Sequence, residues 1–290
     1  MKIQSDEYLY LPEEFHKMHD TCMSLIKQME DFITNDIYKE LKGLSIPINE
    51  KELDLLKNST GDIFDFLLDT NKKEEFERLV INNLIHGLII DNCYFLQEAF
   101  YCSKKMRLTV SFSLFRRPLV FNMVIILRLL FEDNFLEKFI NGKELLQNKE
   151  IDFDAAKFPL NLKDLLIASK GNLIMNNIPG DFIYDTIYNR NISDSFINMS
   201  DKALHPVTTR NPHNRTGAMN LNFIFSTSED IYAQWNYIYH RMPAILLYYI
   251  DLVDTLVFSN LKLNNLSQVL NERLEQRILR TKDCFQSTDS

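Results

Sequence analysis

One short stretch of the chain concentrates the side chains that proteins use to bind anions. Four of them fall within 11 positions, and they are His205, Arg210, His213 and Arg215. No acidic residue occurs at positions 202–228. Arginine makes forked hydrogen bonds to phosphate or carboxylate, so the stretch predicts a phosphate site at Arg210 and Arg215. Histidine exchanges protons near neutral pH, so His205 or His213 would act there as general acid or base.

The same stretch also allows a plainer interpretation. Pro206, Pro212 and Gly217 mark it as a loop, and its arginines could simply pair with surface acids. The alternatives differ in whether the two histidines and two arginines converge on one pocket. Side chains that splay into solvent would favour a non-enzymatic helical scaffold. Such a scaffold would bind a protein partner or form a homodimer, with the apolar segment Leu119–Phe131 or the last helix contributing the interface.

The distribution of charge supports a local site. The formal net charge is −8, yet nine of the 32 lysines and arginines lie in two windows without acids, 99–131 and 202–228. An acidic body with two basic islands favours a local anion site over a surface that is basic throughout. The expected partners are therefore RNA or a nucleotide.

The first basic window also predicts structural ion pairs. Arg117 and Arg128 are 11 positions apart, which is three helical turns, so they share one helix face. Asp91 and Glu98 are seven positions apart on the preceding helical segment. We expect buried ion pairs between these two segments as antiparallel neighbours, although Arg117 is also a third candidate anion contact.

Metal and cofactor chemistry is not predicted. The four cysteines, Cys22, Cys93, Cys102 and Cys284, have no Cys-x-x-Cys spacing, which disfavours a zinc site. Glu13 and His16 have the spacing of a di-iron carboxylate motif, but such a bundle needs a second copy. The sequence has no Gly-rich phosphate loop and no Gly-x-Ser-x-Gly or His-Glu-x-x-His motif.

Breakers are scarce, because the chain has 7 glycines and 8 prolines in 290 residues. Long uninterrupted segments with apolar residues at three- and four-residue spacing indicate helices. The longest predicted helices run from Pro12 to about Leu41, from about Lys73 to Met106, from about Val110 to Phe131 with Pro118 near the start or at a kink, and to about Leu261 from a capping-box pattern at Ser226–Glu229. We expect an all-α bundle of about eight to ten helices, with at most a short extended segment at 221–225. A single domain should cover 1–282, followed by a polar tail at 283–290.

The N-terminus has acids and no apolar run, which argues against a signal peptide. The segment 119–131 is too short to span a bilayer. We therefore expect a cytoplasmic protein without membrane insertion.

The segment Tyr184–His213 resembles the active segment of HEPN proteins, the higher-eukaryote and prokaryote nucleotide-binding helical bundles. The similarity lies in Ser200-Asp-Lys-Ala-Leu-His205-Pro and the following Arg210-Asn-Pro-His213. Many members of that family are RNases of bacterial defence and toxin systems. The resemblance implies a helical bundle that binds nucleotides or RNA. The family motif separates its arginine and histidine by four to six residues, whereas only two separate Arg210 from His213, so the resemblance does not extend to nuclease activity.

Overall fold

A computed structural model describes residues 7–58, 61–141, 154–175, 178–261 and 265–285. The described residues are 71% helical, and they contain twelve α-helices and no strand. Ten of these helices have seven or more residues, which confirms the predicted all-α multi-helix bundle. Residues 222–225 form turns instead of the short extended segment that the sequence allowed. The polar tail at 286–290 lies outside the described residues.

The elements follow one another along the chain, with short 3-10 or π segments between several of the α-helices. Their bounds are η1 (Glu13–Phe15), α1 (His16–Thr34), η2 (Asp36–Leu41), α2 (Glu50–Asn58), α3 (Ile63–Asp69), α4 (Lys73–Lys104), α5 (Leu108–Arg116), η3 (Arg117–Asn122), α6 (Met123–Phe131), α7 (Phe135–Ile140), α9 (Leu162–Ala168), α10 (Gly180–Ile183), η4 (Tyr184–Tyr188), α11 (Phe196–Leu204), η5 (Pro212–Asn214), α12 (Ser228–Asn260) and α13 (Leu266–Phe285).

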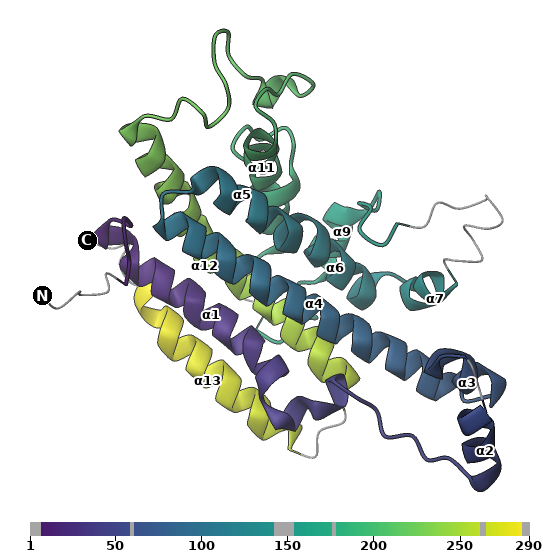
Figure 1. Cartoon of the computed structure of the whole chain (residues 1–290). Coiled ribbons are helices and arrows are strands. Elements are labelled where there is room, and N and C mark those ends of the chain that lie inside the picture. Colours follow the sequence, from purple (N-terminus) through teal and green to yellow (C-terminus); the bar gives the residue numbers. More distant parts are fainter. Residues whose placement is uncertain (1–6, 59–60, 142–153, 176–177, 262–264, 286–290) are drawn as a thin grey trace, which may run out of the picture.

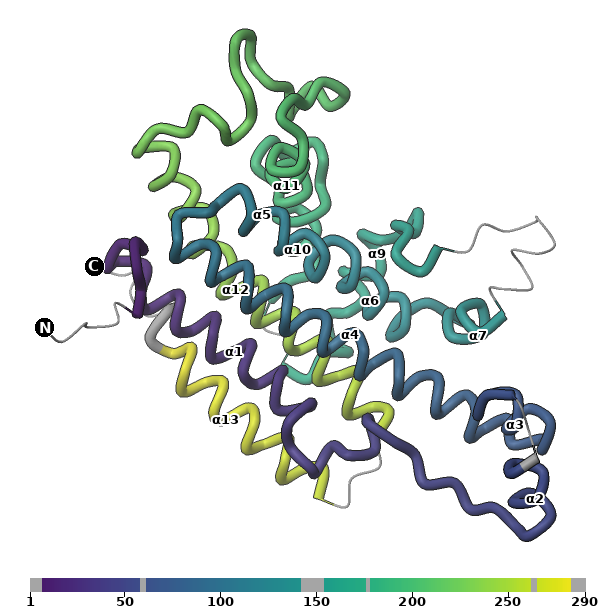
Figure 2. Tube along the Cα trace, in the orientation of Figure 1, coloured from purple at the N-terminus to yellow at the C-terminus, as the bar shows by residue number. Residues whose placement is uncertain are grey.

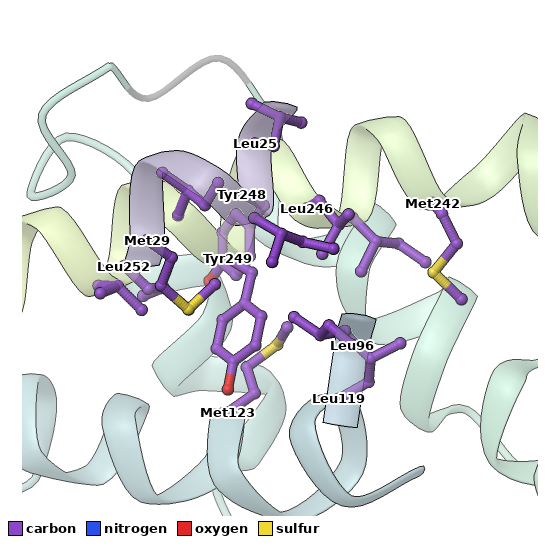
Figure 3. Close-up of a cluster of buried hydrophobic side chains, with 14 of the residues drawn as sticks. Leu25, Met29, Leu96, Leu119, Met123, Met242, Leu246, Tyr248, Tyr249 and Leu252 are labelled. Carbon is purple, nitrogen blue, oxygen red and sulfur yellow. The ribbon is translucent and has the colours of Figure 1, made fainter. Parts of the chain in front are cut away.

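Helix α12 forms the centre of the bundle, with α1, α4 and α6 packed around it (Figure 1). Figure 3 shows Leu246 and Tyr249 of α12 among Met29 of α1, Leu96 of α4 and Met123 of α6. A helix that is apolar on all sides belongs inside a protein, and α12 is buried along most of its length. The bundle gives the rest of the chain a rigid support.

Two helices are long and apolar enough to cross a membrane by length and composition. In α12, 83% of the most apolar window is buried inside the bundle, and in α4 the buried share is 39%. Neither helix is the segment 119–131, whose short length was the basis of the expectation. The expected lack of membrane insertion stays a prediction.

Several helix boundaries differ from those that the spacing of apolar residues predicts. A single helix was expected from Pro12 to Leu41, but Asn35 is extended and its side chain accepts a hydrogen bond from Ile37 N. Helix α1 therefore ends at Thr34. The expected helix at 110–131 contains the π turn η3, because Pro118 has no N–H for the regular ladder.

The N-terminus of α12 also lies one residue beyond its expected cap. Ser226 and Glu229 were the predicted capping pair, whereas Thr227 and Asp230 form the capping box. Thr227 N donates to the Asp230 carboxylate at 2.8 Å, and Asp230 N donates to Thr227 Oγ1 at 3.2 Å. This box fixes where the preceding loop must end.

His19 makes the bundle sensitive to acid, because only 3% of its surface is exposed. Burial lowers its pKa from 6.5 to about 3, assisted by the charges of Lys104 and His16. The unfolded chain therefore binds a proton more readily, and stability is lost as the pH falls from 6.5 toward 3. We expect a loss of about 2 kcal/mol in the free energy of unfolding between pH 7 and pH 5 through this residue. Urea unfolding at both pH values measures it, and His19→Phe, which cannot titrate, should lack that part of the decline. An equal decline in both proteins would contradict this prediction.

Candidate functional site

The basic stretch of the sequence forms most of a loop, residues 205–227, that links α11 to α12 and extends away from the bundle (Figure 2). Its base is closed by paired segments. Thr216 N donates to Thr208 O at 2.8 Å, and Thr208 N donates to Thr216 Oγ1 at 2.7 Å. Asn222 adds a bond from its backbone N to Pro206 O at 2.8 Å and one from Nδ2 to His205 O, also at 2.8 Å. The loop therefore has a defined shape.

Uncharged amide side chains attach this loop to α11. Asn211 Nδ2 donates to Arg190 O and to Asn198 Oδ1, each at 3.0 Å, and Asn214 Nδ2 donates to Asn198 O at 2.8 Å. Asn198 in turn donates to Arg190 O and to Ile192 O. Asn198 and Asn214 are buried. The amides hold the loop in place, so its arginines are not needed as braces.

A hollow of about 530 Å³ lies between this loop and the C-terminal end of α11. Its charged or titratable lining residues are Arg190, Asp201, His205 and Arg210. The rest of the lining is Val207, Thr208, Thr209, Asn211 and Asn214. The hollow therefore combines cationic groups with hydroxyl and amide groups.

The carboxylate in the hollow is shared between two arginines. Asp201 accepts from Arg116 Nη1 at 2.6 Å with one oxygen and from Arg190 Nη1 at 2.7 Å with the other. Arg116 also donates to Ser200 Oγ at 2.8 Å. Arg210 has no ion pair within the described part of the chain. Positive charge therefore exceeds negative charge around this hollow.

The structure brings together two of the four predicted loop residues. His205 and Arg210 line the hollow, whereas His213 and Arg215 are exposed and are not among its lining residues. The four side chains thus converge only in part. One histidine and one arginine remain in place for the predicted chemistry, and the other pair faces solvent.

Arg117, the third predicted anion contact, lies elsewhere. Its Nε donates to Asp91 Oδ2 at 2.8 Å, and its guanidinium lies 5.0 Å from the ring centre of Phe95. The predicted pairing of Arg117 with Asp91 is confirmed, but the Arg117 side chain is 57% exposed, so the pair is not buried.

Arg128 departs from the expected pairing with Asp91 or Glu98. Arg128 Nε donates to Glu132 Oε2 at 2.6 Å, one helical turn further along the chain. Its Nη1 also donates to backbone oxygens at Asp154 and Ala155. An acid four residues away on the same helix competes with one across the bundle, and it costs less ordering of the chain to reach.

Sequence reasoning missed Arg190, Asp201 and Arg116. The basic window without acids, 202–228, begins just after Asp201, so it leaves out the one carboxylate that lines the hollow. Arg190 also lies before this window, since Asp194 and Asp201 stand between it and the loop in sequence. In the folded chain, hydrogen bonds from Asn211 and Asn198 to Arg190 O place Arg190 beside the loop.

The described residues contain no group of three or more His, Cys, Asp and Glu side chains close enough to hold a metal ion. His16, which had di-iron spacing with Glu13, instead has Nε2 2.9 Å from Leu11 O and its ring stacked on Tyr8. Cys22, Cys93 and Cys102 are buried and are not joined in disulfides. Burial raises the pKa of the Cys93 thiol to about 12, which disfavours a reactive thiolate.

Protein-family models, curated proteins and solved structures contain no match to this chain.

Proposed function

We propose that this protein binds the phosphate groups of a nucleotide or RNA in the hollow between α11 and the loop 205–227. One observation carries the proposal. Arg190 and Arg210 line the same hollow, and its single carboxylate, Asp201, is shared by two arginines. The arginines that surround this space are therefore not neutralised, and an anion would balance their charge.

The arrangement suits a phosphate for a second reason. Asp201 orients Arg190, and hydroxyl and amide side chains of Thr208, Thr209 and Asn211 complete the wall. Because the loop is held by amides, Arg210 is free to bind a ligand without loss of folding contacts. A binding residue on such a loop can contact a ligand while the helical bundle keeps its own packing.

RNA cleavage is the finer version of the same proposal. His205 is the only one of the two predicted catalytic histidines that lines the hollow in the described structure. It would supply the general acid or base beside a bound phosphate. His205→Ala would then remove cleavage and spare binding. His213→Ala would leave both unchanged.

Fluorescence anisotropy with a labelled single-stranded RNA tests the binding. We expect affinity to fall as salt rises, because phosphate contacts release counterions. Arg210→Ala should weaken binding and lower the slope of log affinity against log salt by about one. The melting temperature should stay nearly unchanged, because Arg210 makes no ion pair among the described residues.

Arg215→Ala is the matched control, since it removes the same charge from the same loop outside the hollow. Equal effects of the two substitutions would mean diffuse attraction to a basic loop. Unchanged binding by Arg210→Ala, together with a lower melting temperature, would mean that the loop is a structural brace.

A second candidate function is a protein-interaction surface on the same loop. Large apolar side chains are exposed there, including Met219, Ile224 and Phe225, with Phe225 63% exposed. Several exposed apolar side chains on one loop suit contact with a partner or a second copy of the chain. Phe225→Ser should abolish such an association in sedimentation experiments and leave RNA affinity unaltered.

A further inference from the structure

A second hollow, separate from the loop, lies where the start of α1 meets the end of α4. Its volume is about 280 Å³. Tyr10 N donates to Lys104 O at 3.1 Å, and Lys104 Nζ donates to Glu7 O at 2.9 Å, so the N-terminal segment is tied to α4. The lining residues come from this segment and both helices, and they are Glu7, Tyr8, His19, Asp20, Met23, Gln97, Tyr101 and Lys104.

His19 presents a hydrogen-bond acceptor to this hollow. Its Nδ1 lies 3.0 Å from Tyr239 Oη, and the Tyr239 hydroxyl donates to Ser103 Oγ at 3.2 Å. Because the Tyr239 hydroxyl uses its proton to bond Ser103, its oxygen must accept a hydrogen bond from His19 Nδ1–H. The neutral His19 ring then carries its lone pair on Nε2. The Nδ1 edge is bound in the core, so the ring meets the hollow with its Nε2 edge.

His19 Nε2 has no hydrogen-bond partner among the described residues, although only 3% of the surface of His19 is exposed. Burial and the nearby charges of Lys104 and His16 lower the pKa of His19 to about 3. The ring therefore keeps its lone pair at neutral pH. A buried acceptor that faces an open space favours a ligand with a donor to match it.

The other polar groups of the hollow are mainly acceptors as well. Asp20 uses Oδ2 to accept from Tyr8 Oη at 2.8 Å, which leaves Oδ1 available. Gln97 donates its amide N–H to Glu30 at 3.3 Å, so its carbonyl oxygen can accept. Two acidic residues, Glu7 and Asp20, line the hollow together with one cation, Lys104, so acids outnumber cations there.

We propose that this hollow binds a small organic ammonium or guanidinium ion, whose N–H groups donate to His19 Nε2 and to the Asp20 carboxylate. The volume suits a molecule of a few heavy atoms beyond the charged group. A metal ion is a poorer match, because no three metal-ligating side chains gather in the described residues. This site shares no residue with the proposed phosphate hollow, so either proposal can fail alone.

Benzylamine and benzyl alcohol provide a matched pair of probes, since they differ mainly in the ammonium group. Nuclear magnetic resonance of the full chain labelled with ¹⁵N histidine would follow the His19 Nε2 signal during titration. We expect saturable movement with benzylamine and weak or no movement with benzyl alcohol. Asp20→Asn keeps an acceptor for Tyr8 but removes the charge, and it should weaken benzylamine binding about tenfold.

Glu98→Gln serves as the control, because Glu98 is an exposed acid of α4 that does not line the hollow. It should leave benzylamine binding unchanged. The proposal is overturned if both probes bind alike, or if Asp20→Asn and Glu98→Gln have equal effects. It is also overturned if neither benzylamine nor methylguanidine moves the His19 signal at tens of millimolar.

Discussion

Asp254→Leu should lower the free energy of unfolding by about 3–5 kcal/mol, because it leaves two buried arginines without their carboxylate. Asp254 is fully buried in α12 and accepts from Arg273 Nη2 at 2.8 Å and from Arg277 Nη2. Gln28 of α1 accepts from Arg277 Nε at 3.1 Å through its side-chain oxygen. The cluster therefore joins α1, α12 and α13 within the bundle.

Removing all the charges together should be much less damaging than removing one. A variant with Asp254→Leu, Arg273→Met and Arg277→Met leaves no charge of the buried cluster without a partner. Only Asp31, whose side chain is 42% exposed, loses its contact with Arg273 at 3.9 Å. The triple variant should therefore recover much of the lost stability. Arg117→Met is the control, since its pair with Asp91 is more than half exposed on the arginine side, and it should cost less than about 1 kcal/mol. Urea unfolding of the four proteins provides the comparison. A small effect of Asp254→Leu would show that the cluster does not hold the helices together.

Gly180→Ala should also destabilise the fold strongly, by about 1–3 kcal/mol or more. A Cβ at this position would lie 1.8 Å from Leu166 O and 2.3 Å from Leu166 C, which are backbone atoms of α9. Backbone atoms cannot rotate aside as a flexible side chain can, so α9 and α10 would have to move apart.

Gly87→Ala is the matched control for this substitution. Gly87 is an exposed residue of α4, and a Cβ there meets no described atom within 4 Å. Alanine is a better helix former than glycine, so this change should stabilise by about 0.5–1 kcal/mol. Thermal unfolding of both variants gives the comparison. If the two melting temperatures rose together, the close approach of α9 and α10 would be refuted.

The helical class of the fold was predictable because it depends on properties that sequence carries directly. Scarce glycine and proline and a repeat near 3.6 residues produced α1, α4 and α12 in the expected places. The break at Asn35 was not predictable from periodicity, since a single side-chain bond to Ile37 N decides it. The interruption at Pro118 was noted as a kink, but its π geometry depends on the local backbone.

The candidate site was predictable in part. The loop and its basic residues were visible in the sequence, and the structure keeps His205 and Arg210 together. Arg190 comes from another segment, and only the tertiary contacts of Asn198 and Asn211 place it at the loop. Which of several arginines share a hollow is a property of the folded backbone, and composition windows do not contain it.

The sequence also carries a signal of the buried Asp254 cluster. Arg273 and Arg277 are four residues apart on α13 and so share one face. Val269 is buried on that same helix. Charged residues that share a helix face with buried apolar ones indicate a buried ion pair when another helix offers an acid. Such a signal predicts that the two arginines are buried, but it does not identify Asp254 as their partner, because that depends on how α12 packs.

Titration of inorganic pyrophosphate into the protein with ¹⁵N-labelled arginine tests the phosphate site most directly. The account predicts saturable shifts of the Nε signals of Arg190 and Arg210, which line the hollow, and little change at Arg117 and Arg215, which do not. These shifts should weaken as salt rises, because the contacts are ionic. Equal small shifts at every exposed arginine, or no saturation at Arg190 and Arg210, would contradict the proposed function.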